Sequence, residues 1–282
     1  MTEPITITGD EFRKLAEFLY RRTGMVFNET KRYYVERRIM DRMAATSNAK
    51  FAHYFTYLRG ETQGEVEQLI NAFTINETYF YREDHQLECL ARDLLPERVR
   101  GKRTDQPLRI WSVPCSSGEE PYSIAMWLLE NWPQVDTYDI EIVGSDIDTQ
   151  VLEAAATGIY GKRALMRLSA ALIDKYFRRL DEHRWQILDD LRQSVQFSRV
   201  NLMETRETRP QGRFDVIFCR NVLIYFDEES RRLAAENLFE SLLPGGYICL
   251  GHTESMSRIS PLFEVCRFAD AIVYRRPEEK RA

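Results

Sequence analysis

The sequence predicts an α/β protein in which a mostly parallel sheet, covered by helices, follows a small helical domain. Apolar residues recur at helical intervals up to about residue 75. From residue 108 onward, apolar runs typical of strands alternate with helical patterns, which indicates a parallel sheet. We therefore expect a helical domain at residues 1–75, a linker and helix at 76–107, and a sheet domain at 108–282.

Composition limits the class of protein. The chain has 282 residues, 44% of them hydrophobic and 29% charged, which is enough for one large domain or two domains of unequal size. The formal net charge of -5 argues against a protein that wraps nucleic acid through bulk charge. The first 74 residues hold eleven Lys and Arg against ten Asp and Glu, so the acidic excess belongs to the later part.

The first helix is predicted by its cap and its periodicity. Thr8 and Glu11 have the spacing of a capping box, and Gly24 offers a stop. Between them, the apolar residues at helical intervals are Phe12, Leu15, Ala16 and Leu19.

A second helix is expected after Asn28, a favourable N-cap residue. Its apolar stripe consists of Val35, Ile39 and Met43. Another face carries three cations, Lys31, Arg38 and Arg42. Such a face is usually a solvated surface, so a binding role needs a further reason. Helical patterns at 51–58 and 65–73 complete the domain.

The strands of the sheet are predicted by five runs, at 108–113, 140–145, 194–198, 214–219 and 247–250. Helices are expected to open at Glu119 and to span 231–243. Two last runs, 263–266 and 271–274, are too close together for a helical crossover, so we expect an antiparallel hairpin at the sheet edge. An insertion at about 162–199 is expected to hold a helix and a short hairpin around 185–188.

The five cysteines are odd in number and far apart, without a C-x-x-C pair or a histidine at ligand spacing. We expect reduced thiols, no metal site and a cytoplasmic, monomeric protein. The N-terminus has no basic start followed by an apolar stretch, and no apolar run approaches the ~20 residues of a membrane span. We therefore expect neither a signal peptide nor insertion into a membrane.

Ligand-binding residues are expected just after the strands, because open parallel sheets bind ligands at the carboxyl ends of their strands. The loop 114–120 is rich in small residues but lacks G-x-G-x-x-G, so a plain turn is about as good an interpretation. Asp146 is placed to accept both hydroxyls of a ribose, or else to cap the next helix. An acid without phosphate-binding glycines predicts a nucleoside ligand without pyrophosphate, a description that S-adenosylmethionine fits.

The remaining strand-end residues suit this ligand. Glu120 would suit the ammonium group of its amino-acid part. Asn201 and Leu202 could hold the adenine by one hydrogen bond and one apolar contact. Arg220 and Asn221 would lie by the transferred methyl group, since a polar pair inside an apolar run is hard to explain as core.

Five segments together resemble the chemotaxis receptor methyltransferases of the CheR family, which methylate receptor glutamates. They are NETYFYRE at 76–83, SGEEPYSIA at 117–125, SDID at 145–148, FCRNVLIYF at 218–226 and LPGGYI at 243–248. The resemblance covers nearly the whole chain. It implies a small all-α N-terminal domain and a Rossmann-like class I S-adenosylmethionine-dependent methyltransferase domain with a small β-subdomain insertion.

The resemblance also implies site residues and a partner. Cofactor contacts are implied at Asn76, Thr78, Arg82, Glu120, Asp146, Asn201, Leu202, Arg220 and Asn221. The product would be S-adenosylhomocysteine. The partner would be the cytoplasmic helical domain of a chemoreceptor, recognised by the helix that carries Lys31, Arg38 and Arg42.

The expected mechanism needs no base, because a glutamate carboxylate is already ionised at pH 7. Arg82 and Tyr225 are the residues we expect to orient this carboxylate, by a guanidinium fork and a phenol hydrogen bond. Arg82 could equally contact the cofactor carboxylate, and Tyr225 could be an aromatic core residue of a strand.

The insertion departs from the family pattern. No glycine lies between Gly161 and Gly212, whereas many members have a glycine-containing turn associated with docking a receptor's C-terminal pentapeptide. We therefore expect an enzyme that needs no pentapeptide tether. Two alternatives stay open: a methyltransferase for another substrate, such as nucleic acid, and a non-catalytic adaptor that binds S-adenosylmethionine. An NAD-type oxidoreductase is disfavoured by the missing glycine fingerprint.

Overall fold

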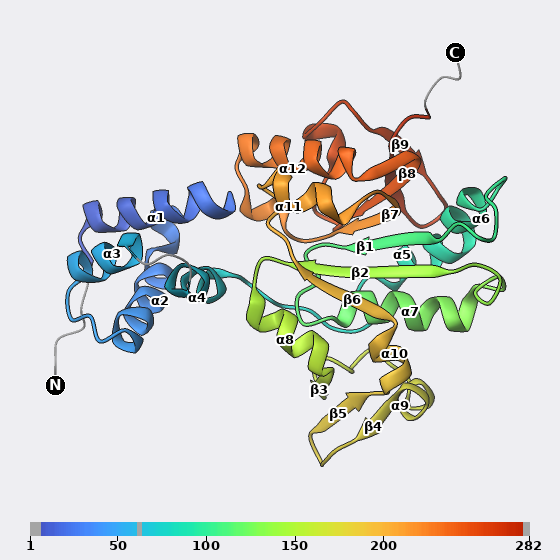
Figure 1. Ribbon diagram of the computed structural model, residues 1–282, viewed down its shortest axis with the longest axis horizontal. Helices are drawn as coiled ribbons and strands as arrows, with labels where there is room; N and C mark the ends of the chain where they lie inside the picture. The colour runs from blue at the N-terminus through green and yellow to red at the C-terminus, as the bar shows by residue number, and fades with distance from the viewer. Residues whose placement is uncertain (1–6, 61–63, 279–282) are drawn as a thin grey trace. The chain divides into compact units, whose positions relative to one another are not determined.

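The structure, a computed structural model, describes residues 7–60 and 64–278. The chain forms two compact units. The first contains the residues up to Ile75 together with Tyr225–Ser230, and the second contains Asn76–Ile224 and the residues from Arg231 onward (Figure 1). Residues 76–107, expected as linker and helix, belong to the second unit. The first six residues of the expected helical domain lie outside the described part.

The first unit is built from α1 (Gly9–Thr23), a 3₁₀ turn η1 (Glu29–Lys31), α2 (Arg32–Ala45), α3 (Phe51–Gly60) and α4 (Gly64–Phe73). The capping box of Thr8 and Glu11 is confirmed, and α1 ends at Gly24 with φ 72. Its core holds apolar side chains from all four helices, among them Leu15, Leu19, Val35, Ile39, Tyr54, Leu58, Leu69 and Phe73.

The expected cap of the second helix is wrong in its geometry. Asn28 precedes the 3₁₀ turn η1, and α2 begins only at Arg32. The side chain of Asn28 caps no backbone group; instead its Oδ1 accepts a hydrogen bond from Oγ1 of Thr30 at 2.6 Å. Lys31 therefore lies in η1 rather than in α2.

The second unit is built on a seven-stranded sheet in the order β6-β2-β1-β7-β8-β10-β9. Its strands are β1 (Leu108–Ser112), β2 (Ile140–Asp146), β6 (Val195–Arg199), β7 (Phe214–Cys219), β8 (Leu242–Leu250), β9 (Glu264–Arg267) and β10 (Ile272–Arg275). The first five in the order are parallel, and β10 runs antiparallel to β8 and β9. The expected antiparallel hairpin at the sheet edge is confirmed.

Helices and turns precede and connect these strands. They are α5 (Asp84–Cys89), the π-helical turn η2 (Leu90–Leu94), α6 (Leu95–Arg98), α7 (Glu119–Asn131), α8 (Thr149–Thr157), α11 (Thr205–Thr208), η3 (Arg209–Gln211), η4 (Leu223–Tyr225), α12 (Glu228–Glu240) and η5 (Met256–Arg258). Helix α7 packs against β1, β2 and β6, and α8 packs against β2 and β6.

One expected helix is displaced along the sequence. α12 spans Glu228–Glu240 rather than 231–243, and it begins just after Asp227, whose Oδ1 accepts from the backbone N–H of Ser230 at 2.8 Å. It ends early because residues from Leu242 already pair with Phe214 as the start of β8. Long-range strand pairing, which periodicity does not show, therefore sets this boundary.

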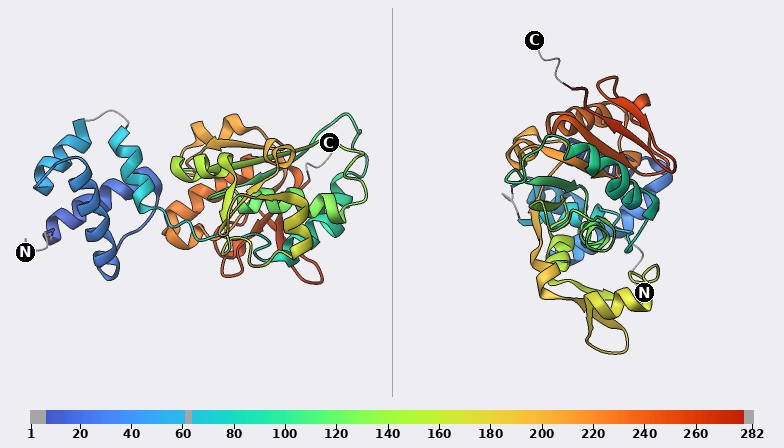
Figure 2. Two further views of the ribbon diagram at one scale, coloured as in Figure 1. Left: turned by 90° about the horizontal axis from the view of Figure 1, so that it is seen from below. Right: turned by 90° about the vertical axis from the view of Figure 1, so that its right-hand side faces the viewer.

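The insertion forms a separate three-stranded sheet. This small sheet, drawn in yellow-green to yellow, projects away from the large sheet in the right-hand view of Figure 2. Its strands are β3 (Ile159–Gly161), β4 (Phe177–Arg179) and β5 (Arg184–Ile187), in the order β3-β5-β4, with helices α9 (Ala170–Tyr176) and α10 (Asp189–Gln193). The small sheet therefore starts before residue 162, and the end of the expected insertion, β6, belongs to the large sheet. No described helix is long and apolar enough to cross a bilayer.

Candidate active site at the carboxyl ends of the strands

The large sheet has its topological switch point between β1 and β7. From β1 the chain continues outward to β2 and β6, whereas β7 and β8 extend the sheet on the other side. Ligands of open α/β sheets bind beyond the carboxyl ends of the strands at such a point. The residues that follow β1, β2, β6, β7 and β8 are therefore the candidates for a binding site.

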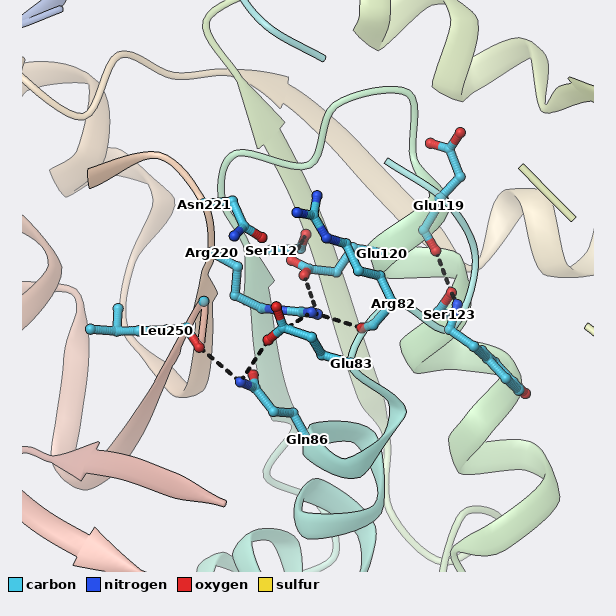
Figure 3. A network of polar contacts seen from close by, with 12 residues as sticks. Arg82, Glu83, Gln86, Ser112, Glu119, Glu120, Ser123, Arg220, Asn221 and Leu250 are labelled. Atoms are coloured by element: carbon cyan, nitrogen blue, oxygen red, sulfur yellow. Dashed lines mark hydrogen bonds and ion pairs between the residues drawn. The ribbon is translucent and has the colours of Figure 1, made fainter. Parts of the chain in front are cut away.

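A buried guanidinium, that of Arg220 directly after β7, lies at the centre of these residues (Figure 3). Its Nη1 donates to Oε2 of Glu120 at 2.9 Å, and its Nη2 donates to the backbone carbonyl of Arg82 at 2.7 Å. Nη2 also lies 3.2 Å from Oε2 of Glu83. Because the side chain of Arg220 is only 3% exposed, its charge needs these two carboxylates as counter-charges.

Glu120 connects this cluster to the first strand. Ser112, the last residue of β1, donates from Oγ to Oε1 of Glu120 at 2.7 Å. Glu120 also lies in the first turn of α7, where the helix dipole favours an acidic side chain. Both carboxylate oxygens thus have partners, which hold the carboxylate at the end of β1.

Glu83, which our sequence analysis missed, is held in an uncommon backbone conformation with φ 56. Nε2 of Gln86 donates to its Oε2 at 3.1 Å and to the carbonyl of Leu250 at 2.8 Å. Nδ1 of His252 lies 3.0 Å from Oε1. Burial acts to raise the pKa of Glu83, but Arg220 and His252 outweigh it, so the pKa is lowered and the carboxylate stays ionised.

Asp146 ends β2 and is 3% exposed. Its Oδ2 accepts from the backbone N–H of Ser116 at 2.8 Å, and its Oδ1 accepts from that of Asp148 at 3.0 Å. Burial raises the pKa of Asp146 to about 6, although these backbone donors oppose the shift. The capping alternative for Asp146 is wrong, because Asp148 caps α8 by accepting from Gln150 and Val151.

The loop after β1 comes close to α8. Gly118 has φ 92, and a Cβ added there would lie 2.9 Å from Cβ of Ala155 and 3.1 Å from the hydroxyl of Tyr160. Only glycine fits this position without a shift of its neighbours. The loop can therefore pack closely and bring the N–H of Ser116 to Asp146.

Asn76, Thr78 and Arg82 share one segment of the second unit. Nδ2 of Asn76 donates to Oδ2 of Asp148 at 2.7 Å, which places Asn76 beside the end of β2. Thr78 and Arg82 are half-buried. Nη1 of Arg82 donates to the carbonyl of Glu77 at 2.8 Å. Two hydrogen bonds thus hold this segment beside the strand ends, one from Asn76 to Asp148 and one from Arg220 to the backbone carbonyl of Arg82.

Asn201 and Leu202 follow β6, the neighbour of β2. The N–H of Val200 donates to the carbonyl of Asp146 at 2.9 Å, which holds the two strand ends together. Asn201 is 5% exposed and Leu202 is 6% exposed. All the expected cofactor residues belong to the second unit, and those outside the segment 76–82 lie at or after the carboxyl ends of β1, β2, β6 and β7.

Tyr225 belongs to the first unit instead. It ends the 3₁₀ turn η4 and is half-buried, so the alternative of an aromatic core residue in a strand is wrong. Its carbonyl accepts from the N–H of Val26 at 3.0 Å, and Phe226 forms a β-bridge with Met25. Nζ of Lys31 lies 5.6 Å from the centroid of the Tyr225 ring. A substrate-recognition candidate and a catalytic candidate are therefore neighbours.

The other two cations of the expected basic face are bound to their own unit. Arg42 forms a bidentate pair with Glu65, with distances of 3.0 Å and 2.5 Å, and the side chain of Glu65 is 4% exposed. Nε of Arg38 donates to the carbonyl of Ala72 at 2.6 Å, and its guanidinium lies 3.5 Å from the ring centroid of Tyr34. Arg38 and Arg42 thus join α2 to the α4 region and are not simply solvated.

Two buried cysteines, Cys115 and Cys219, lie in and beside the loops at these strand ends. Burial raises the pKa of Cys115 and of Cys219 well above its ordinary value, so both remain thiols. Among residues 7–60 and 64–278 no group of three or more His, Cys, Asp or Glu side chains could hold a metal ion.

Comparison with known proteins gives the family. Residues 76–272 match the model described as CheR methyltransferase, SAM binding domain, and residues 10–74 match CheR methyltransferase, all-alpha domain. The chain belongs to the CheR methyltransferase family.

Curated CheR relatives match along nearly their whole length. "Chemotaxis protein methyltransferase 2" of Vibrio cholerae is 47% identical, covering 99% of this chain and 96% of the relative. The protein of the same description from Pseudomonas aeruginosa is 39% identical, covering 90% of each chain. "Chemotaxis protein methyltransferase" of Escherichia coli is 34% identical, covering 93% of this chain and 90% of the relative.

Family membership establishes a Rossmann-like methyltransferase domain and S-adenosylmethionine as the cofactor of this CheR protein. The donor set fits this cofactor. Carboxylates at the ends of β1 and β2 suit an ammonium group and a ribose, and the loop after β1 lacks the glycine run that phosphates require. Nε of Arg220 is buried and has no hydrogen-bond partner among the described residues, so the site retains an unused donor.

Proposed function

We propose that this protein methylates glutamate side chains in the cytoplasmic helical domains of chemoreceptors, forming glutamate methyl esters. The observation that carries the proposal is the match of both CheR domains along the chain, together with relatives named as chemotaxis protein methyltransferases. The charged cluster of Arg220, Glu120 and Glu83 at the sheet's switch point, with the buried Asp146 at the end of the neighbouring strand β2, supports a cofactor site there.

The cofactor contacts proposed for this chain follow from side-chain chemistry at the strand ends and, for Asn76, Thr78 and Arg82, from the resemblance to the CheR family. Asp146 binds the ribose hydroxyls, and Glu120 binds the ammonium group. Asn201 and Leu202 hold the adenine. The remaining contacts are those of Asn76, Thr78, Arg82, Arg220 and Asn221.

The reaction needs alignment and not proton transfer. S-adenosylmethionine supplies a methyl group on a sulfonium; the bond from carbon to sulfur breaks as the bond from carbon to the glutamate oxygen forms. One positive and one negative charge disappear together, and no proton moves, so no catalytic histidine is required. The residues act by holding the reacting atoms in line and excluding water.

Arg82 and Tyr225 are the proposed residues for orienting the substrate carboxylate. A guanidinium matches the two carboxylate oxygens, and a phenol donates one directional hydrogen bond. Too strong a grip would stabilise the nucleophile and slow the reaction, so we propose orientation and not activation.

The proposed receptor-binding face consists of Lys31, Arg38 and Arg42. It suits an acidic helical substrate through complementary charge. Since Arg42 is neutralised by Glu65, we assign the larger share of the attraction to Lys31 and Arg38.

We further propose that recognition needs no pentapeptide tether. In the β-subdomain the connection between β4 and β5 consists of residues 180–183 and holds no glycine. Tight binding of a receptor C-terminal pentapeptide in a calorimetric titration would contradict this part of the proposal.

The deciding experiment is transfer of labelled methyl groups to a panel of receptor cytoplasmic fragments. Release of the label as methanol in mild base identifies carboxyl esters. We expect base-labile label on receptor glutamates and none on RNA. Label on RNA alone would support a nucleic-acid methyltransferase, and cofactor binding without any transfer would support a non-catalytic adaptor.

A further inference from the structure

One carboxylate, that of Glu254, joins the loop after β7 to the loop after β8. Its Oε2 accepts from the backbone N–H of Asn221 at 2.8 Å and from that of Gly251 at 2.9 Å. Its Oε1 accepts from the backbone N–H of Leu223 at 2.8 Å. A carboxylate suits this place because it is an acceptor only, with lone pairs for all three donors.

Asn221 needs such support because its backbone is in the left-handed region, with φ 60, which is uncommon for residues other than glycine. Conformations of this kind persist when the surroundings hold them, and they gather at functional sites. The hydrogen bond to Glu254 starts at the N–H of Asn221 itself, and the bond from Leu223 fixes the chain two residues later.

Gly251 completes the arrangement. A Cβ added there would lie 2.7 Å from Nδ2 of Asn221 and 2.9 Å from Oε2 of Glu254. Oε2 of Glu254 is held by two backbone N–H donors, and the added Cβ would also lie 3.0 Å from the backbone N of Asn221. A side chain at 251 would therefore displace Asn221 even with Glu254 present. The side-chain amide of Asn221 is thus bounded on one side by Gly251, and the backbone N–H of Asn221 is bonded to Glu254.

We propose that Glu254 is a positioning residue, which holds Asn221 in the conformation that presents its side-chain amide to the cofactor. Glu254 acts through Asn221 and does not touch the cofactor itself. The inference rests on the proposed contact of Asn221 with the cofactor. It gives a role to Glu254, an acid that is not among the residues expected to bind cofactor or substrate.

The test uses the full chain and S-adenosylhomocysteine as the probe, so no receptor is needed. Two variants disturb Asn221 by different means. Glu254→Gln places an amide with a single oxygen opposite three backbone N–H donors. Gly251→Ala adds a methyl group that crowds Asn221 and leaves Glu254 unchanged. The matched controls are Glu236→Gln, an exposed acid on α12, and Gly161→Ala, where the nearest atom to the added Cβ is 3.8 Å away. Dissociation constants come from calorimetry and melting temperatures from thermal unfolding.

We expect both test variants to weaken binding by about tenfold or more, because each displaces the amide of Asn221 and so removes the hydrogen bond proposed between that amide and the cofactor. Both controls should bind as the wild type does. Asn221→Gly, which removes the amide but accepts φ 60, should weaken binding similarly. When Asn221 is already Gly, Glu254→Gln should weaken the binding of S-adenosylhomocysteine by less than a further factor of about two, because Glu254 acts through a side chain that is no longer present.

A lowered melting temperature with unchanged affinity in Glu254→Gln or Gly251→Ala would show a merely structural role and overturn the proposal. So would full additivity with Asn221→Gly, or loss of cooperative unfolding in both test variants. If the wild type binds the probe but methylates no receptor fragment, the proposed function fails while this inference is still decided by the affinities.

Discussion

Arg220 and Glu120 form an ion pair of 2.9 Å between the end of β7 and the first turn of α7, with side chains 3% and 14% exposed. The two residues are a hundred positions apart in the chain and adjacent at the switch point of the sheet. Glu83 is the second counter-charge of Arg220, so the guanidinium has a charged partner besides Glu120. The proposed contact of Glu120 with the ammonium group would therefore leave Arg220 with a counter-charge.

Glu120→Gln is expected to weaken S-adenosylhomocysteine binding by about tenfold or more, because the ammonium group and Arg220 both lose a charged acceptor. Calorimetry at pH 7.5 measures this. Glu119→Gln is the matched control: Glu119 is the neighbouring buried acid, burial raises its pKa, and its side chain accepts from Ser117. Equal weakening by both variants would remove Glu120 from the proposed cofactor contacts.

Tyr225→Phe is expected to lower kcat for receptor methylation by about tenfold, the value of one directional hydrogen bond, while leaving S-adenosylhomocysteine affinity nearly unchanged. Initial rates at saturating substrate measure it. Tyr33→Phe serves as control, since Tyr33 is 78% exposed and lies in the same unit. Unchanged turnover in Tyr225→Phe would exclude Tyr225 from the mechanism.

The pH dependence of cofactor affinity should follow Asp146. Burial raises its pKa to about 6, so this carboxylate, which we propose accepts the ribose hydroxyls, is almost fully ionised at pH 7.5 and largely protonated at pH 5. We expect affinity for S-adenosylhomocysteine to fall by about tenfold between these values. The Asp146→Asn variant should bind S-adenosylhomocysteine weakly at both pH values. A pH dependence that survives in Asp146→Asn would assign it to other groups, such as Glu119, whose pKa burial also raises.

Arg42→Ala is expected to destabilise the helical unit by about 3 kcal/mol, because it removes the cation that compensates the buried carboxylate of Glu65, which the neutral hydroxyl of Tyr54 at 2.7 Å does not replace. Thermal unfolding followed by circular dichroism detects the loss. Arg37→Ala, at an exposed position of the same helix, should change stability by less than about 0.5 kcal/mol. Equal stability of Arg42→Ala and the wild type would show that the pair with Glu65 contributes little.

Charge reversal at Lys31 and Arg38 should raise KM for receptor several-fold without altering cofactor affinity. Arg42 is left intact, because its charge is already neutralised by the buried carboxylate of Glu65. Arg13→Glu is the control, because Arg13 is an exposed cation on α1. An unchanged KM that is also insensitive to ionic strength would favour a solvated basic face without a role in binding.

Several elements were predictable because their signals are local. The capping box at Thr8, the left-handed stop at Gly24 and the apolar stripe of α2 depend on residues within a few positions of one another. The hairpin of β9 and β10 was predictable because the short connection excludes a helical crossover. By contrast, the start of β8 at Leu242 depends on pairing with Phe214, so its early start and the end of α12 were missed.

The candidate site was predictable in part, because the carboxyl ends of parallel strands meet at one edge of a sheet. This reasoning found Glu120, Asp146 and Arg220 without any coordinates. It missed Glu83 and Glu254. The position of Glu83 depends on a left-handed backbone, and the role of Glu254 depends on three backbone N–H groups from two loops.

The sequence by itself determined the fold class, the strand-end residues and the kind of ligand, because hydrophobic periodicity and the ends of strands depend on residues that are close together in the chain. Only the tertiary structure decided which charges are partners: Arg220 with Glu120 and Glu83, and Arg42 with Glu65. It also decided that Tyr225 packs with the first unit. Such pairings join residues far apart in the chain, and burial makes them necessary, because a charge removed from water must find its counter-charge within the fold.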